Sequence, residues 1–305
     1  MKNLNSKSAD LVKSIARELM TCKVGTKIPT TPQLAAKFSV GFGTVDKAMS
    51  VLKETGAIKL QSKGQLGTLL LEKDMSALWV MTEQGPLVGS SPLPNTIEFQ
   101  GLASGLIEMF MEQGITCSLT YKNGGTIRVK QLLGGQCDFV IMSHMSAVQV
   151  CAEHPHLRIV SIMENNSYYM DLIILRRKDV TSDITEWRIG FDPTSYDHIT
   201  LSDEIFSGNE KTNVHYGNIP YLIADGVIDA AIWHSTQLVP TALIDILAVQ
   251  QVETPRTENE KNMAAAFVVD GAREDIIALF EDQCDAGRIG KIQQEVITRK
   301  RSPAY

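Results

Sequence analysis

Residues 25–71 decide how the chain is organised, and they read GTKIPTTPQLAAKFSVGFGTVDKAMSVLKETGAIKLQSKGQLGTLLL. Thr31 followed by Pro32 predicts the start of a short helix, because threonine caps helices and proline is tolerated in the first turn. From Thr44 onward, apolar residues recur at the spacing of a second helix, at Val45, Ala48, Met49 and Leu52. Residues 58–60 and 68–71 then predict two strands joined by a glycine-containing turn. Helix, turn, helix and hairpin follow each other in a winged helix-turn-helix, whose second helix enters the major groove of DNA.

The residues off the apolar stripe of the second helix are available to a DNA groove. We expect lysines there and in the hairpin to contact phosphates, and Thr44 and Ser50 to touch phosphates or base edges. Lys63 and Gly64 would approach the minor groove. The candidate DNA-binding residues are Thr31, Gly43, Thr44, Lys47, Ser50, Lys53, Lys63 and Gly64.

This stretch resembles the DNA-binding domain of GntR-type bacterial regulators. The matching pieces are Lys27-Ile28-Pro29, Leu34-Ala35, Gly43-Thr44-Val45, Ala48, Leu52, Gly56 and the hairpin sequence KGQLGT at residues 63–68. The whole chain resembles the YhfZ family, in which such a domain precedes a solute-binding-protein-like domain. GntR relatives usually have arginines around the turn and the recognition helix, whereas this chain reads VGFG at residues 40–43. We therefore expect no bidentate arginine contact to guanine from this helix.

Charge divides the chain of 305 residues, which has a formal net charge of −6. Residues 1–71 contain eleven Lys and Arg and four Asp and Glu, a balance of +7. The remainder contains eighteen and thirty-one, a balance of −13. A basic head on an acidic body is expected when only the head meets phosphate.

Targeting and metal signals are absent from the sequence. No apolar run approaches the eighteen residues of a membrane-spanning helix, and MKNLNSKSAD at the N-terminus has no hydrophobic signal core. We therefore expect a cytoplasmic protein with no membrane partner. The five cysteines are odd in number and scattered, which indicates reduced thiols. The six histidines form no HExxH arrangement, so we expect no metal site and no cofactor.

Beyond residue 74 the pattern alternates between strands and helices. We predict a strand at 78–81, a loop at 82–94, a helix that opens at Asn95 or Thr96 and ends at Gly114, a strand at 115–121, a helix around 129–133 and a strand at 138–142. The spacing G-x-x-D-x-x-I occurs at Gly135 and again at Gly226, which predicts a second unit of the same construction. Apolar residues 170–175 and 264–269 would cross between the two lobes. Residues 273–299 would be helical and pack on the first lobe.

Two α/β lobes joined by two crossing strands form the type II periplasmic-binding-protein architecture, and the YhfZ resemblance implies the same fold. The expected fold class is therefore α/β, with an N-terminal winged helix-turn-helix and a two-lobed type II periplasmic-binding-protein-like domain. The expected domains are residues 1–74 and 75–305. Lobe one would span about 75–172 and 268–305, and lobe two about 173–267.

Ligands of open α/β sheets bind beyond the C-terminal ends of the strands, where helix N-termini offer N–H groups. In lobe one this rule nominates Thr82, Glu83, Ser90, Ser91, Asn95, Tyr121, Asn123, Ser143, His144 and Ser146. In lobe two it nominates Asp192, Thr194, Ser195, Tyr196, Tyr216, Asn218, Trp233 and His234. If the repeat is real, Ser143 and His234 face one another. Because the cleft loops contain no cation except Lys122, we expect a small polar anion held by N–H and hydroxyl groups.

The leading hypothesis is a ligand-responsive transcription regulator, a homodimer whose partners are double-stranded DNA and a small-molecule effector. An enzyme stays open as an alternative, a lyase or transferase with His144, His234, Glu83 and Asp192 as acid–base candidates. A protein-interaction module whose winged helix binds another protein is a third reading.

Overall fold

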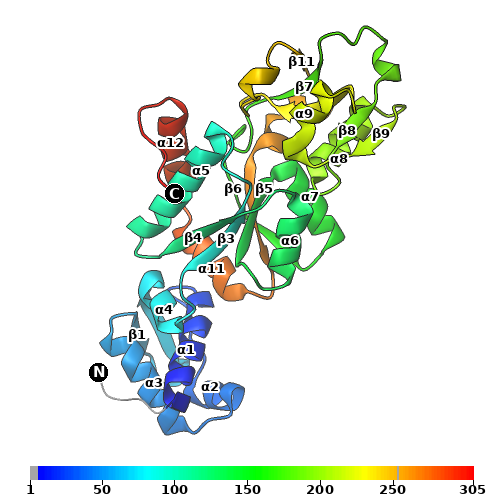
Figure 1. Ribbon diagram of the computed structural model, residues 1–305. Coiled ribbons are helices and arrows are strands. Elements are labelled where there is room, and N and C mark those ends of the chain that lie inside the picture. The colour runs from blue at the N-terminus through cyan, green and yellow to red at the C-terminus, as the bar shows by residue number, and fades with distance from the viewer. Residues whose placement is uncertain (1–5, 253) are drawn as a thin grey trace. The chain divides into compact units, whose positions relative to one another are not determined.

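The computed structural model describes residues 6–252 and 254–305, which form two compact units (Figure 1). The first unit comprises the chain up to Leu87 together with Phe110–Cys117 and Ala272–Cys284. The second unit comprises Val88–Met109, Ser118–Gly271 and Asp285–Tyr305. Within the described residues, no helix is long and apolar enough to span a membrane.

The first unit is a winged helix-turn-helix with additional helices, and the predicted order of helix, turn, helix and hairpin is confirmed. The apolar stripe predicted for the second helix is buried. Helix α11, from near the end of the chain, packs against α1 and α4. The elements of this unit are α1 (Ser6–Thr21), α2 (Thr31–Phe38), α3 (Phe42–Glu54), β1 (Ile58–Ser62), β2 (Thr68–Lys73), α4 (Met75–Thr82) and α11 (Glu274–Gln283).

The cap of α2 is Thr30, not Thr31. The Thr30 hydroxyl accepts a hydrogen bond from the Gln33 backbone N–H, and the Gln33 side chain accepts one from the Thr30 N–H at 2.8 Å. Because Thr30 and Thr31 are adjacent, either could cap the helix. Gln33 lies three residues after Thr30, the spacing of a capping box, and this makes Thr30 the cap. Thr31 instead donates to the Asp46 carboxylate of α3 at 3.2 Å.

The predicted strand at residues 78–81 is wrong, because these residues lie in α4. The Asp74 side chain accepts from the Ala77 N–H and so caps this helix. Four consecutive apolar residues do not distinguish a strand from a buried helix. The first strand of the sheet is β3 (Leu87–Ser91), inside the stretch predicted as a loop.

Lobe one of the second unit is a five-stranded sheet in the order β4-β3-β5-β12-β6. Strand β3 runs parallel to β5, while β12 runs antiparallel to both β5 and β6. The remaining elements of this lobe are β4 (Cys117–Tyr121), β5 (Phe139–Ser143), β6 (Leu157–Ile162), β12 (Ala265–Asp270), α5 (Ile97–Glu112), α6 (Gly125–Leu133), α7 (His144–Glu153) and α12 (Ala286–Ile297).

Lobe two repeats this order with different strands, β9-β8-β10-β7-β11. Strand β10 is parallel to β8, and β7 is antiparallel to β10 and β11. The two predicted crossing segments each form a strand in a different sheet: β7 pairs in the sheet of lobe two, and β12 pairs in the sheet of lobe one. The elements of lobe two are β7 (Leu172–Arg177), β8 (Ile189–Phe191), β9 (Lys211–Asn213), β10 (Ala230–His234), β11 (Leu247–Gln251), α8 (Tyr196–Ile205), α9 (Ile219–Ala224) and α10 (Pro255–Glu258).

The recurring G-x-x-D spacing has the same structural role in both lobes. The Asp138 carboxylate accepts from the Val88 N–H at 2.8 Å, and Asp229 accepts from the Arg188 N–H at 2.9 Å. The two glycines have φ values of +65° and +70°, which a side chain rarely tolerates. Each motif thus turns the chain out of a helix and ties the next strand to the first strand of its lobe. The predicted internal repeat is confirmed.

The C-terminal helical segment is two helices rather than one. Helix α12 packs on α5 so closely that a Cβ at Gly105 would lie 2.6 Å from the Ile289 carbonyl oxygen. Helix α11 belongs to the first unit, where Asp275 accepts hydrogen bonds from the Arg273 and Gln84 side chains. The prediction that the whole segment packs on lobe one is therefore correct only for α12.

Candidate functional site

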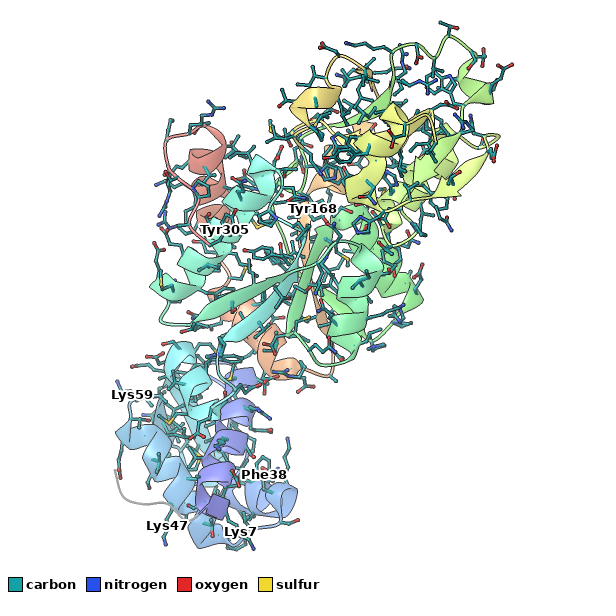
Figure 2. The ribbon with its side chains drawn as sticks, viewed as in Figure 1. Lys7, Phe38, Lys47, Lys59, Tyr168 and Tyr305 are labelled. Atoms are coloured by element: carbon teal, nitrogen blue, oxygen red, sulfur yellow. The ribbon has the colours of Figure 1, made fainter. Side chains whose placement is uncertain are left out.

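The exposed face of α3 and the hairpin hold the predicted DNA-binding residues. Lys47, Lys53 and Lys63 are exposed, Lys47 at the surface of the first unit (Figure 2). Thr44 and Ser50 are half-buried beside them. Gly64 has φ +58° in the tip of the hairpin, where the Lys63 N–H donates to the Gly67 carbonyl at 2.8 Å. Gly43 lies in the first turn of α3, and Thr31 at the start of α2 contacts that helix through Asp46.

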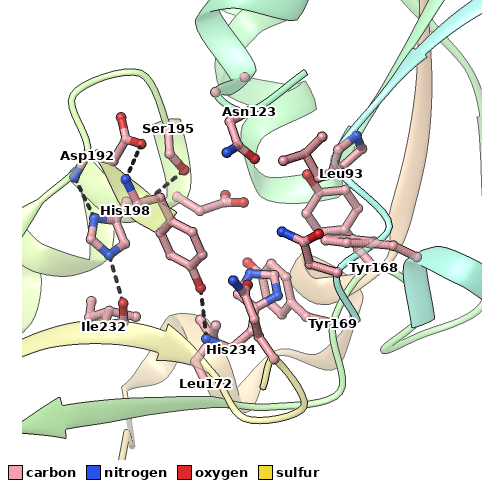
Figure 3. A pocket seen from close by; sticks show the side chains of 18 of the residues that line it. Leu93, Asn123, Tyr168, Tyr169, Leu172, Asp192, Ser195, His198, Ile232 and His234 are labelled. Atoms are coloured by element: carbon pink, nitrogen blue, oxygen red, sulfur yellow. Dashed lines mark hydrogen bonds between the residues drawn. The ribbon is translucent and has the colours of Figure 1, made fainter. Parts of the chain in front are cut away.

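A cavity of about 90 Å³ lies between the two lobes of the second unit (Figure 3). One water needs roughly 10–15 Å³ by the same measure, whereas drug-sized sites begin near about 300 Å³. This cavity therefore suits a small ligand. Aromatic rings form much of its wall, at Phe99, Tyr168, Tyr169, Tyr216 and His234.

Arg128 supplies a cation that the sequence analysis missed. Its side chain is only 4% exposed and lines the cavity. The guanidinium donates to the carbonyls of Ile141 at 3.2 Å and Lys122 at 2.8 Å, and to the Tyr168 hydroxyl at 3.1 Å. Among the described residues, no carboxylate lies within ion-pair distance of it. A buried charge with no partner at ion-pair distance is costly, although the buried Asp197 carboxylate also interacts with it electrostatically.

The position of Arg128 was visible in the sequence. Arg128 shares the buried face of α6 with Val129 and Leu132, where an arginine is unusual. The rule for strand ends nominates the loops that follow the strands, and Arg128 lies in the helix after one of these loops.

Two carboxylates line the same cavity, but the chain itself satisfies both. Asp192 accepts from the N–H and hydroxyl of Thr194 at 2.8 and 2.6 Å, and from the Tyr216 N–H at 3.0 Å. Asp197 of lobe two accepts from the hydroxyls of Ser143 and Ser146 of lobe one, both at 2.7 Å.

Burial raises the pKa of Asp197, although the hydroxyls of Ser143 and Ser146 and the Arg128 charge oppose that shift. Asp197 thus joins the two lobes at the N-terminus of α7.

Burial favours the neutral form of two histidines of lobe two, His198 and His234. Burial lowers the pKa of His198, whose Nδ1 accepts from the Asp192 N–H at 2.8 Å while Nε2 lies 2.8 Å from the Ile232 carbonyl oxygen. This pairing requires the tautomer with the proton on Nε2, so both ring nitrogens are engaged within the protein. Burial also lowers the pKa of His234, to about 3, and its buried Nδ1 has no hydrogen-bond partner within the described chain.

The predicted ligand residues fall into three groups. Those that line the cavity are Asn95, Asn123, Asp192, Ser195, Tyr216 and His234. Those that hold a lining residue in place are Ser143, Ser146, Thr194 and Trp233, the last of which stacks on Tyr216 at 4.6 Å. Those that lie elsewhere are Thr82, Glu83, Ser90, Ser91, Tyr121, His144, Tyr196 and Asn218.

The residues in the third group have identifiable structural settings. Thr82 and Glu83 end α4 in the first unit, so the strand end that nominated them does not exist. Ser90 and Ser91 are buried within β3, and the Ser90 hydroxyl donates to Gln131 at 2.8 Å. Because Glu83 and His144 do not line the cavity, the four acid–base candidates are not brought together.

Ser143 and His234 occupy matching positions, as the last residues of β5 and β10. The Ser143 hydroxyl is engaged with Asp197 and does not line the cavity. The turn at residues 123–125 meets lobe two closely instead. A Cβ at Gly124 would lie 2.3 Å from the Thr194 hydroxyl oxygen, and the Thr126 N–H donates to the Thr194 carbonyl at 3.0 Å.

Fold and cavity together define a helix-turn-helix protein with a domain like the periplasmic binding proteins, and comparisons with known proteins agree. Residues 23–70 match a helix-turn-helix domain family, and residues 74–305 match the YhfZ C-terminal domain family. The chain therefore belongs to the YhfZ family. YhfZ of Escherichia coli (strain K12) is 27% identical over 304 residues, which are 98% of each chain.

Solved structures support the same fold. The crystal structure of YhfZ from Shigella flexneri has a TM-score of 0.61 and 25% identity, covering 76% of this chain and 98% of that one. The periplasmic aliphatic sulphonate binding protein SsuA from Escherichia coli has a TM-score of 0.52 and 13% identity, covering 71% and 75%. At that identity the likeness to SsuA concerns the fold alone.

Proposed function

We propose that this protein is a ligand-responsive transcription regulator that binds DNA through its winged helix and a small anion between its lobes. The observation that carries this proposal is the exposed, lysine-bearing face of α3 in a segment whose charge balance is +7, on a chain whose remainder has −13. Contacts to backbone phosphates dominate the affinity of proteins for DNA. Only the head has the net positive charge that attracts these phosphates.

The buried Arg128 supports the anionic character of the effector. Asp192 and Asp197 accept hydrogen bonds from other groups of the protein, whereas the Arg128 guanidinium, with five N–H groups, donates to three acceptors among the described residues. Part of the unused hydrogen-bonding capacity of the cavity is therefore that of a cationic donor. A carboxylate, sulfonate or similar small anion with an apolar part against the aromatic wall would satisfy it.

The remaining features of the proposal follow from the helix-turn-helix. Such proteins commonly bind paired half-sites as dimers, so we propose a homodimer that acts in the cytoplasm. The family matches at residues 23–70 and 74–305 support a domain boundary at residue 74. The chain passes directly from β12 of lobe one into α11, which packs against α1 and α4 of the first unit. An effector that favours one arrangement of the lobes can therefore act on the head through this chain connection.

Substitution of two lysines tests the DNA-binding role. In the full-length protein, the double variant Lys47→Ala and Lys63→Ala should lose affinity for a mixed-sequence duplex and flatten the salt dependence by about two units of slope. The control Lys291→Ala removes an exposed lysine of α12 and should behave as wild type. Unchanged affinity and slope in the double variant would refute the assignment.

A further inference from the structure

An aromatic side chain stands at the DNA-facing end of α3. Phe42 is the first residue of this helix and is 60% exposed. In a helix-turn-helix, the N-terminal residues of the second helix contact base edges in the major groove. A single exposed apolar residue needs no explanation elsewhere on a protein surface, but at this position it would meet a base pair.

Neither of the two glycines beside Phe42 is required by tight packing or by a left-handed backbone, although Gly41 is the N-cap of α3. A Cβ added at Gly41 or Gly43 would meet nothing within 4 Å, and neither residue has a positive φ. Neither packing nor backbone conformation therefore requires glycine at these positions. Because glycine has no side chain, the backbone on both sides of Phe42 can approach a partner surface closely, and the aromatic ring stays unobstructed.

The other side chains of this face offer little hydrogen-bonding specificity. Lys47 and Lys53 suit phosphates, and the Asp46 carboxylate already accepts from Thr31. The face contains none of the Arg, Asn or Gln residues that form bidentate contacts with guanine or adenine. The major groove presents one apolar group, the 5-methyl of thymine, which phenylalanine contacts favourably.

We propose that Phe42 is a specificity-determining residue that recognises a thymine 5-methyl group in the major groove. This inference rests on the proposed DNA-binding function. The flanking lysines hold α3 against the phosphates, and the ring of Phe42 then reads one base pair by apolar contact. Base preference at that position would come from the methyl group and not from hydrogen bonds.

Selection from a library of random duplexes tests the proposal on full-length protein. Wild type should enrich sequences with one fixed thymine. Replacing that thymine by uracil should weaken binding about fourfold, the factor that corresponds to the ~0.8 kcal/mol of one buried methyl-sized group. Phe42→Ala should lose both the enrichment and the response to uracil while keeping the salt slope of wild type.

Two further variants control this experiment. Val80→Ala truncates a side chain of α4 that is 59% exposed, and it should keep the thymine preference. Phe42→Leu should keep part of it, because an apolar contact remains. Since Phe42 is exposed, its truncation is not expected to unfold the head, and an unchanged thermal transition verifies this.

The possible failures are distinguishable. Absence of binding to any duplex at low ionic strength would overturn the proposed function itself. Binding with no fixed thymine, with indifference to uracil, or with a preference retained in Phe42→Ala would overturn the role of Phe42 alone. A Phe42→Ala variant that changes only self-association would also overturn it, by assigning the ring to a protein contact.

Discussion

At the scale of single residues, we expect the proposed ligand binding to depend most on Arg128. We expect Arg128→Gln to weaken binding of short carboxylates and sulfonates by roughly ten- to a hundredfold, since a charge-assisted hydrogen bond contributes about 1.5–3 kcal/mol. Calorimetric titration against anionic, neutral and cationic small molecules measures this.

Lys122→Gln is the matched control, because it removes an exposed positive charge that does not line the cavity. Arg128→Lys, which keeps the charge, separates loss of affinity from loss of folding. Tight binding to uncharged compounds only, or anion binding that survives Arg128→Gln, would contradict the assignment.

We expect His234 to make the stability of the second unit sensitive to acid. Its pKa is about 3 in the folded protein because of burial, against roughly 6.5 in an unfolded chain. The unfolded state therefore takes up a proton first as the pH falls, and stability declines below about pH 6.5. Between pH 6.5 and 5 the loss from this group would be up to about 2 kcal/mol.

Denaturant unfolding at pH 7.5 and pH 5.0 tests this point. His234→Gln should lose less free energy of unfolding between the two pH values than wild type does. His198, whose pKa burial also lowers, stays in the variant and contributes the remaining acid sensitivity. An equal pH dependence in the two proteins would show that His234 already titrates normally in the folded state.

At the level of single elements, the start of α2 provides a matched pair of substitutions. Thr30→Ala removes the capping box and should lower the stability of the head by about 1 kcal/mol. Thr31→Ala loses only an exposed hydrogen bond to Asp46 and should cost less. Thermal unfolding of the full-length variants, followed in the transition of the head, ranks them. The opposite ranking would restore Thr31 as the cap.

Sequence patterns predicted the elements that have clear periodicity. The stripe of α3 and the hairpin were found because their buried positions recur at fixed spacing. The G-x-x-D repeat was found because both lobes need a left-handed glycine and an aspartate that accepts from a backbone N–H. Residues 78–81 were misassigned because four apolar residues in a row show no polar face, although Val80 is exposed.

The cavity was less predictable than the strands around it. Asn123 and Ser195 were found because they follow strand ends, where the rule for α/β sheets applies. Arg128, Tyr168 and Asp197 come from a helix face, a crossing segment and a helix N-terminus, and only tertiary structure brings these together. The crossing segments were predicted from their apolar runs, but the sheet in which β7 and β12 each pair is a property of topology that local spacing does not encode.

For the molecule as a whole, the central claim is that the basic head binds the phosphate backbone of DNA while the acidic two-lobed domain binds a small molecule. The most direct test is the affinity of the full-length protein for a mixed-sequence duplex as a function of salt. We predict binding at low ionic strength, with a log–log slope of about −2.7 or steeper per head if Lys47, Lys53 and Lys63 each neutralise one phosphate. No binding at low ionic strength, with the thermal transition of the head intact, would contradict the claim.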